Sequence, residues 1–147
     1  MHVFGQLDIT YQKPSKEILD LVDAPLSPTV AMNTEGSTAI LLYRRQFKTI
    51  AELSEPELRL GGLRINPKTN INSRQRYYFQ LKLLDVESGK EQTIKGLPEE
   101  GQFSNFLWSE KEDRMALTNT VENGVKLWVI NIEKATAEKI TDAELNA

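Results

Sequence analysis

The stretch Lys126-Leu127-Trp128-Val129-Ile130-Asn131-Ile132 decides the fold class. Its aromatic and β-branched side chains are typical of a β-strand. Side chains alternate between the two faces of a strand, so Leu127 and Val129 lie on one face and Trp128 and Ile130 on the other. A polar turn at 133–136 and a return strand at 138–140 complete a hairpin. A strand that is apolar on both faces has to be covered from both sides.

Three more hairpins precede this one along the chain. Their turns lie at 33–37, 87–90 and 109–113, where glycine, asparagine, serine and charged residues separate the apolar runs. We expect strands at 30–32, 39–43, 79–86, 91–94, 105–108, 115–118, 126–132 and 138–140. Strands and helices do not alternate along the chain, so a parallel sheet is disfavoured.

The hairpins repeat in sequence. Met32 and Ala39, which flank the first turn, align with Trp108 and Met115, which flank the third. The run 85–89 aligns in the same way with the run 131–135. Two successive hairpins make a four-stranded antiparallel unit of the size of a propeller blade. The sequence therefore predicts an all-β fold with two antiparallel, four-stranded, propeller-like blades, a short N-terminal helix and a helical or loop insertion.

The predicted domain organisation follows from these units. Residues 1–28 form an N-terminal arm with the short helix, residues 29–100 the first blade with its insertion at 45–76, and residues 101–147 the second blade and the start of the next linker. The helix begins after Ser15 and ends before Ala24-Pro25, because a residue that precedes proline avoids the α region. Its apolar stripe consists of Ile18, Leu19, Leu21 and Val22. A helix this short is unstable alone, so we expect it to dock.

Composition excludes several classes of function. The 147 residues carry a formal net charge of −3, no cysteine, and a single histidine, His2. Disulfides, thiolate metal sites and a histidine-based triad within this chain are thereby excluded, and we expect no cofactor and no metal ion. A mildly acidic chain is not expected to bind nucleic acid. No apolar run reaches the roughly 18 residues of a membrane span, and the N-terminus lacks the pattern of a signal peptide.

Several segments match a known family pattern. The motifs are Tyr11-x-x-Pro14-x-x-Glu17-Ile18-x-Asp20-Leu21-Val22-Asp23-Ala24-Pro25, then Pro56-Glu57-Leu58-Arg59-Leu60-Gly61-Gly62-Leu63-Arg64-Ile65-Asn66 with Thr69-Asn70 and Ser73-Arg74, then Phe106-Leu107-Trp108-Ser109 and Leu145-Asn146-Ala147. In these motifs the chain resembles the N-terminal propeller of the prolyl oligopeptidase family of serine peptidases. More narrowly, it resembles the glutamyl endopeptidase branch.

The resemblance implies a seven-bladed propeller in front of an α/β-hydrolase domain. It also implies a Ser-Asp-His triad on that second domain, with the serine in a Gly-x-Ser-x-Gly turn. This chain contains no Gly-x-Ser-x-Gly, so no catalytic residue is carried over. We therefore expect a non-catalytic propeller fragment, two blades of the seven, that gates or orients peptide substrates for a serine peptidase. Its expected partners are the remaining blades, the hydrolase domain and peptides. A periplasmic parent is compatible with the resemblance, and the compartment is left open.

Two other functions remain as alternatives. One is a free-standing β-rich module that binds a protein or another ligand through propeller-like repeats. The other is a small hydrolase, for which the chain offers no usable pair of nucleophile and base. Under the propeller interpretation, two blades alone leave apolar faces and strand edges uncovered. The isolated chain is then expected to self-associate or to be only marginally folded.

The insertion carries the candidate site. Between Arg44 and Arg76 the chain has eight basic residues and three acidic ones. If this segment faces the cavity between propeller and hydrolase, its arginines can hold an acidic side chain with paired hydrogen bonds. The candidate substrate-binding residues are Arg64, Arg74 and Arg76. The alternative is a solvated loop whose arginines pair with Glu52, Glu55 and Glu57.

Three structural features are also expected in and around the insertion. Thr49 and Glu52 have the spacing of a capping box, which opens a short helix that Pro56 ends. Gly61-Gly62 indicates a loop with positive φ angles. Trp108 and Trp128 lie inside apolar runs, so we interpret both as core residues.

Overall fold

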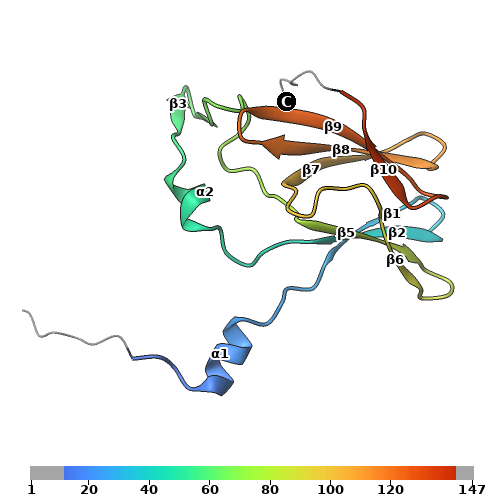
Figure 1. The fold of residues 1–147 in the computed structure, drawn as a ribbon, viewed down its shortest axis with the longest axis horizontal. Coiled ribbons are helices and arrows are strands. Elements are labelled where there is room, and N and C mark those ends of the chain that lie inside the picture. Colours follow the sequence, from blue (N-terminus) through green and yellow to red (C-terminus); the bar gives the residue numbers. More distant parts are fainter. Residues whose placement is uncertain (1–11, 142–147) are drawn as a thin grey trace, which may run out of the picture.

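The computed structural model describes residues 12–141, and these residues form two four-stranded antiparallel sheets, a small hairpin and two short helices (Figure 1). The sheets lie one over the other in Figure 1. The first sheet has the order β1-β2-β5-β6, with strands Thr29–Met32, Thr38–Tyr43, Gln80–Asp85 and Glu91–Thr93. The second has the order β7-β8-β9-β10, with strands Phe103–Trp108, Arg114–Val121, Gly124–Asn131 and Thr136–Lys139. The predicted all-β, antiparallel class is confirmed.

The two sheets also repeat each other in register. Met32 pairs with Ala39 in the first sheet, as Trp108 pairs with Met115 in the second. The two central strands of each sheet match too. Thr38 of β2 pairs with Asp85 of β5 in the first sheet, and at the equivalent position Arg114 of β8 pairs with Asn131 of β9 in the second. At the far edge the pairs are Leu84 with Glu91 and Ile130 with Ala137. The repeat read from the sequence is thus a repeat of hydrogen-bonded pairs, although β7 contains an irregularity between Ser104 and Leu107.

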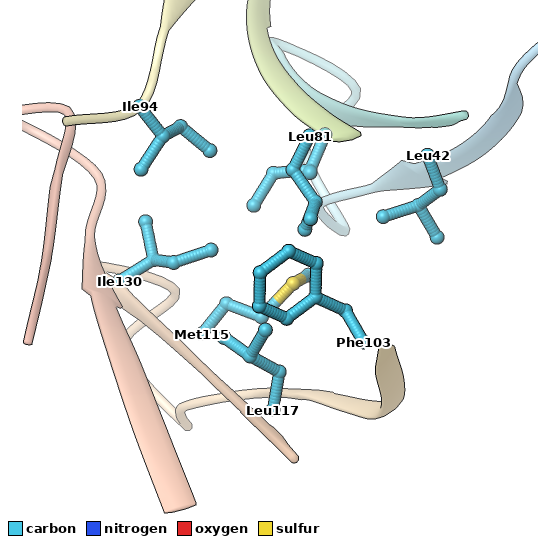
Figure 2. Close-up of a cluster of buried hydrophobic side chains, with 8 residues drawn as sticks. Leu42, Leu81, Ile94, Phe103, Met115, Leu117 and Ile130 are labelled. Atoms are coloured by element: carbon cyan, nitrogen blue, oxygen red, sulfur yellow. The ribbon is translucent and has the colours of Figure 1, made fainter. Parts of the chain in front are cut away.

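The hydrophobic core lies between the sheets (Figure 2). It consists of Ile40, Leu42, Leu81 and Ile94 from the part of the chain that forms the first sheet and Phe103, Met115, Leu117 and Ile130 from the second sheet. In Figure 2 the Phe103 ring lies among the side chains of both sheets. Trp108 and Trp128 pack against this cluster, which confirms their interpretation as core residues. Burying an aliphatic or aromatic side chain of this size contributes about 1.5–3 kcal/mol.

Backbone hydrogen bonds also join the two sheets. Tyr78 and Phe103 exchange two N–H···O bonds of 2.9 Å each, at the start of β5 and of β7. After β6, the Lys95 N–H donates to the carbonyl of Ala135, and the Ala137 N–H donates to the carbonyl of Lys95 at 2.7 Å. Gly96 follows with a φ of 90°, and a Cβ there would lie 2.3 Å from the Ala137 carbonyl oxygen. Only glycine fits where the first sheet passes so close to β10.

Each sheet carries apolar side chains on its outer face, among polar and charged ones. Val129 and Leu127 lie on the outer face of the second sheet, opposite Trp128 and Ile130 in the core, as the alternation predicts. Leu107 pairs with Ala116 on the same outer face and is 71% exposed. On the outer face of the first sheet, Val30 pairs with Leu41 and is 50% exposed.

The N-terminal helix does not dock. Helix α1 (Lys16–Val22) projects away from the sheets in Figure 1 and contacts no other helix or strand of the described residues. Its stripe is open to solvent, with Leu21 78% exposed. The expectation that this helix packs on the chain is therefore wrong for residues 12–141, because an apolar stripe predicts burial without specifying the surface that covers it. Residues 1–11 of the predicted N-terminal arm at 1–28, and the motif Leu145–Ala147, lie outside the described residues.

The insertion has its own small elements beside the two sheets. Helix α2 (Ile50–Ser54) starts with the predicted capping box, in which the Glu52 N–H donates to the Thr49 hydroxyl and the Thr49 N–H to the Glu52 carboxylate. Strands β3 (Leu58–Leu60) and β4 (Leu63–Ile65) form a hairpin around Gly61 and Gly62, whose φ angles are 54° and 94°. Both local predictions are confirmed. No helix within residues 12–141 has the length and apolar character needed to cross a membrane.

Candidate functional site

A basic cavity lies where the insertion leaves and rejoins the first sheet. Its volume is about 410 Å³, and its walls come from residues 44–48, which follow β2, from residues 74–79, which precede β5, and from residues 99–102. Two of the three predicted site residues, Arg74 and Arg76, line it. Arg44, Arg45 and Lys48 line it as well, against the acidic residues Glu52, Glu99 and Glu100. The pairing of β2 with β5 brings these distant segments together.

The arginines of this basic cavity lack partner carboxylates. Within the described residues, Arg44, Arg45, Arg74 and Arg76 take part in none of the ion pairs. The Arg45 guanidinium lies over the Phe79 ring, 5.8 Å from its centroid, which is a cation–π geometry. A guanidinium without a carboxylate partner retains its donors for a planar anion such as a carboxylate.

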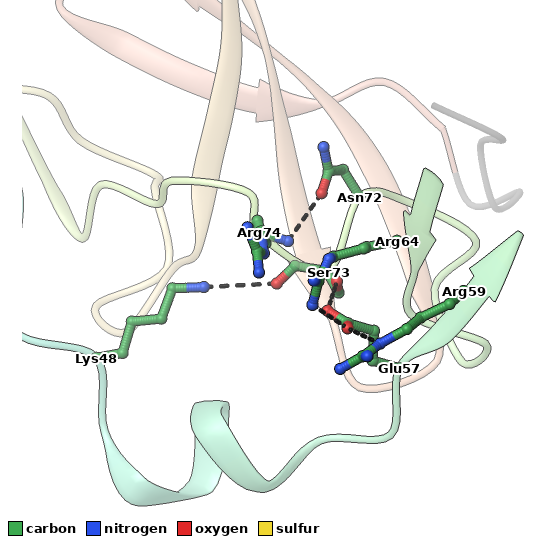
Figure 3. A network of polar contacts seen from close by, with 7 residues as sticks. All are labelled: Lys48, Glu57, Arg59, Arg64, Asn72, Ser73 and Arg74. Carbon is green, nitrogen blue, oxygen red and sulfur yellow. Dashed lines mark hydrogen bonds and ion pairs between the residues drawn. The ribbon is translucent and has the colours of Figure 1, made fainter. Parts of the chain in front are cut away.

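Arg64, the third predicted site residue, lies elsewhere. Its Nη1 is 2.7 Å from Oε1 of Glu57, and the Nε of Arg59 reaches the same oxygen at 3.3 Å (Figure 3). The Ser73 hydroxyl donates to the other carboxylate oxygen at 2.6 Å. This bond, together with the two guanidinium groups, holds the pKa of Glu57 below its ordinary value, although partial desolvation acts in the opposite direction. Arg64 thus fixes the insertion, whereas Arg74 and Arg76 face a cavity.

The other two acidic residues of the insertion pair with polar groups rather than with arginine. Glu52 belongs to the capping box of α2. Glu55 accepts a hydrogen bond from the Asn66 side-chain amide. Of the three acids in the insertion, Glu57 is the one that neutralises arginines within the described residues, so most of the basic residues keep their charge uncompensated.

A second cavity, of about 400 Å³, adjoins the first. The two cavities share the wall residues Lys48, Glu52, Tyr77, Glu100 and Gln102. The rest of the second wall comes from the insertion, from Pro98, and from the end of β8 and the turn that follows it. It consists of Glu55, Asn66, Thr69, Asn72, Ser73, Pro98, Asn119, Thr120, Val121 and Glu122.

Two buried hydroxyl groups in the second cavity's wall lack hydrogen-bond partners. Thr69 and Thr120 are 6% and 7% exposed, and neither side-chain oxygen has a partner. Burial raises the pKa of Tyr77, and the charges of Glu55 and Glu52 raise it further. The Thr120 hydroxyl lowers that pKa, although the two groups do not meet hydrogen-bond geometry. The raised pKa of Tyr77 thus reflects mainly the burial of its side chain at the shared wall, with a smaller contribution from the two carboxylates.

Sequence reasoning did not identify this second cavity. Thr69 and Thr120 lie in different halves of the chain, and Glu100 and Glu122 belong to no motif. Their proximity depends on how β8 packs beside the insertion, which no spacing in the sequence encodes. Within residues 12–141, no three or more acidic, histidine or cysteine side chains are placed to hold a metal ion.

Comparison with known proteins found two similar plant proteins. The chain is 31% identical over 143 residues to a protein named "Probable glutamyl endopeptidase, chloroplastic" from Arabidopsis thaliana, and 29% identical over 140 residues to the protein of that name from Oryza sativa subsp. japonica. These matches cover 91% and 88% of this chain. No protein-family model matches the chain. The chain spans about 15% of the length of each relative. The similarity over nearly the whole chain suggests an origin related to glutamyl endopeptidases.

Proposed function

We propose that this chain forms two blades of the N-terminal β-propeller of a serine peptidase related to glutamyl endopeptidases. In this role the chain is not itself catalytic. It gates or orients peptide substrates for an α/β-hydrolase domain in the same parent protein. The observation that carries the proposal is the repeat of strand order and register between the two sheets. Propellers are built from such four-stranded antiparallel units, arranged around an axis.

The similarity to the two plant proteins supports the same proposal. Their names state a peptidase activity, and the alignment extends across both sheets and the insertion. The absence of a Gly-x-Ser-x-Gly motif from this sequence supports a non-catalytic role.

The experiment that tests the role has two parts. The purified chain, incubated with a fluorophosphonate probe and with glutamyl peptides, is expected to show neither labelling nor hydrolysis. The reading frame of the source gene downstream of Ala147 is expected to encode a Gly-x-Ser-x-Gly, then an aspartate, then a histidine. Stoichiometric labelling of a serine such as Ser37, Ser73 or Ser104 would contradict the non-catalytic role. A conserved stop codon directly after Ala147 would favour the alternative, a free-standing binding module.

We further propose that the basic cavity binds the acidic side chain of the peptide. Arg74 and Arg76 are the proposed acid-binding pair, and they are supported by the missing carboxylate partners and by the neighbouring Arg44 and Arg45. Arg64 is proposed to act indirectly, because its ion pair with Glu57 fixes the loop that carries Ser73 and Arg74.

Substitution in the full-length parent tests the acid-binding pair. In Arg74→Gln/Arg76→Gln, KM for glutamyl peptides is expected to rise about tenfold or more, because charge-assisted hydrogen bonds are lost, while KM for neutral peptides stays unchanged. Lys68→Gln is the matched control, since Lys68 is an exposed cation of the same insertion and lies outside both cavities. Equal losses on acidic and neutral peptides would mean that the two arginines have a structural role.

A further inference from the structure

We propose that the second cavity is a binding site for an organic cation, the protonated amine of a peptide, next to the basic cavity that takes the acidic group. The two cavities then bind the two oppositely charged groups of one peptide segment, with the acidic group in the basic cavity and the amine in the second cavity. This inference deepens the proposed function and rests on it for the nature of the ligand. The site itself rests on the side chains of the cavity.

The first support is the pair of unsatisfied hydroxyl groups. Thr69 and Thr120 line the cavity, and their side-chain oxygens are buried without a partner. A buried hydroxyl without a hydrogen bond is unfavourable, because it has lost its contacts with water, so such groups in a cavity wall indicate a missing donor. An ammonium group carries three donors and no acceptor, which matches two hydroxyl oxygens that lack donors.

The second support is the charge of the wall. Glu100 and Glu122 line the cavity, and neither takes part in an ion pair within residues 12–141. Glu52 and Glu55 add negative charge, and Lys48 supplies the one cation of the wall. The Lys48 ammonium is directed to the Ser73 carbonyl, 3.5 Å away, in Figure 3. The wall therefore has an excess of negative charge that a cationic ligand would neutralise.

The third support is the position of the site. Tyr77, Lys48, Glu52, Glu100 and Gln102 belong to both cavities, so a single extended segment can reach from one to the other. Arg74 and Arg76 lie on the basic side and Glu122 on the acidic side, and none of the three forms an ion pair within the described range 12–141. Opposite fields at neighbouring sites fix the direction in which a charged chain binds.

Three five-residue peptides with amidated C-termini test the site on the whole chain by NMR titration. The first is acetyl-Ala-Ala-Lys-Ala-Ala-amide, and the second replaces its lysine by the uncharged norleucine. The third is the norleucine peptide with a free N-terminus, which separates a lysine side chain from an α-amino group as the source of the cation. We expect at least one of the two cationic peptides to bind about tenfold more tightly than the neutral one, with shifts at the amides of Thr69 and Thr120.

Variants connect that difference to the named side chains. In Glu100→Gln/Glu122→Gln the preference for the cationic peptide is expected to disappear, and in Thr69→Val it is expected to weaken. Glu110→Gln/Glu133→Gln is the matched control, because both residues are exposed in turns away from the cavity. The amide spectrum of each variant shows whether the fold is retained. Equal binding of all three peptides, or shifts that avoid the cavity, would overturn the inference. The peptidase proposal is tested separately by the downstream reading frame.

Discussion

The side chain of Glu112 stabilises a left-handed backbone conformation that is unfavourable for any residue other than glycine. Its φ is 55°, in the left-handed region, where the equivalent residue of the first repeat is Gly36 with a φ of 73°. The N–H groups of both residues close their turns, onto the carbonyls of Ser109 and Asn33. The Glu112 carboxylate accepts from the Thr34 N–H at 2.9 and 3.1 Å and from the Thr34 hydroxyl. These bonds join the turns of the two sheets and offset the strain.

Substitution of Glu112 separates the strain from the hydrogen bonds. Glu112→Ala keeps the left-handed backbone and loses the bonds, so the free energy of unfolding is expected to fall by about 1–2 kcal/mol. Glu112→Gly loses the same bonds but relieves the strain, so its loss is expected to be about 1 kcal/mol smaller. Urea denaturation measures both, with Glu110→Ala in the same turn as the control. Equal losses for the alanine and glycine variants would show that the backbone stores no strain.

Glu57 makes stability depend on pH. Its pKa is lowered in the folded state, mainly by the Ser73 hydroxyl and then by Arg64 and Arg59. The unfolded chain therefore takes up this proton more readily. The stabilisation is present above the unfolded pKa of about 4.3 and is lost as the pH falls through the folded pKa. In Glu57→Gln, the loss of stability on acidification below about pH 5 is expected to be shallower than in the unmodified chain. Thermal melts across this range measure it, with Glu133→Gln as the control. An unchanged acid slope would contradict the role of Glu57.

Among the elements, α1 and β8 represent opposite extremes of packing. Helix α1 has no buried residue and touches no other element, whereas β8 lies between β7 and β9 and is mostly buried. A seven-residue helix without tertiary contacts is marginal in water. Its apolar stripe matches the propeller proposal, in which the rest of the parent protein would cover it.

Hydrogen exchange is expected to separate these two elements. The amides of α1, including the Asp23 N–H that donates to the Leu19 carbonyl, should exchange at nearly the rate of an unfolded peptide. The amides of β8 should be the most strongly protected of the described residues. Native-state exchange followed by NMR at several protein concentrations measures both. Strong protection of α1 at the lowest concentration would show that the helix docks on its own chain.

At the scale of the molecule, the outer faces of the two sheets determine how the isolated chain behaves. Leu107 is 71% exposed on one outer face, and Val30 and Met32 are 50% and 48% exposed on the other. Strands β1 and β7 are also sheet edges, with unpaired backbone groups on one side. In a closed propeller, neighbouring blades would cover such faces. Alone, the chain has to leave them in water or pair them with a second copy.

We therefore expect the isolated chain to self-associate, through stacked sheet faces or paired edges, or else to be marginally folded. Sedimentation velocity over a concentration series is expected to show species larger than a monomer. Leu107→Lys should weaken this association, because it places a charge on an outer face. Leu53→Lys is the matched control, since Leu53 is 70% exposed on α2, away from the sheets. A compact monomer that melts cooperatively at high concentration would contradict this expectation and weigh against the propeller proposal.

The features of the fold that depend on local pattern could be predicted from the amino-acid sequence. The alternation in 126–132, the turns and the repeat predicted eight strands and their pairing, because period and turn chemistry act over a few residues. The capping box at Thr49 and the positive φ angles at Gly61 and Gly62 were predictable for the same reason. For the site, the sequence singled out Arg64, Arg74 and Arg76, since an excess of basic residues in one segment can be counted without knowing the fold.

The tertiary structure alone decided which charges meet. Arg64 pairs with Glu57 while Arg74 and Arg76 face a cavity, although all three arginines look alike in sequence. The second cavity exists because the insertion packs beside the end of β8, which brings Thr69 and Thr120 to one wall. The position of α1 could not be predicted for the same reason. An apolar stripe on a helix indicates that the helix packs on something, but it does not specify which surface covers it. Contacts between segments far apart in the sequence depend on how all the elements pack together, and no local sequence pattern specifies that packing.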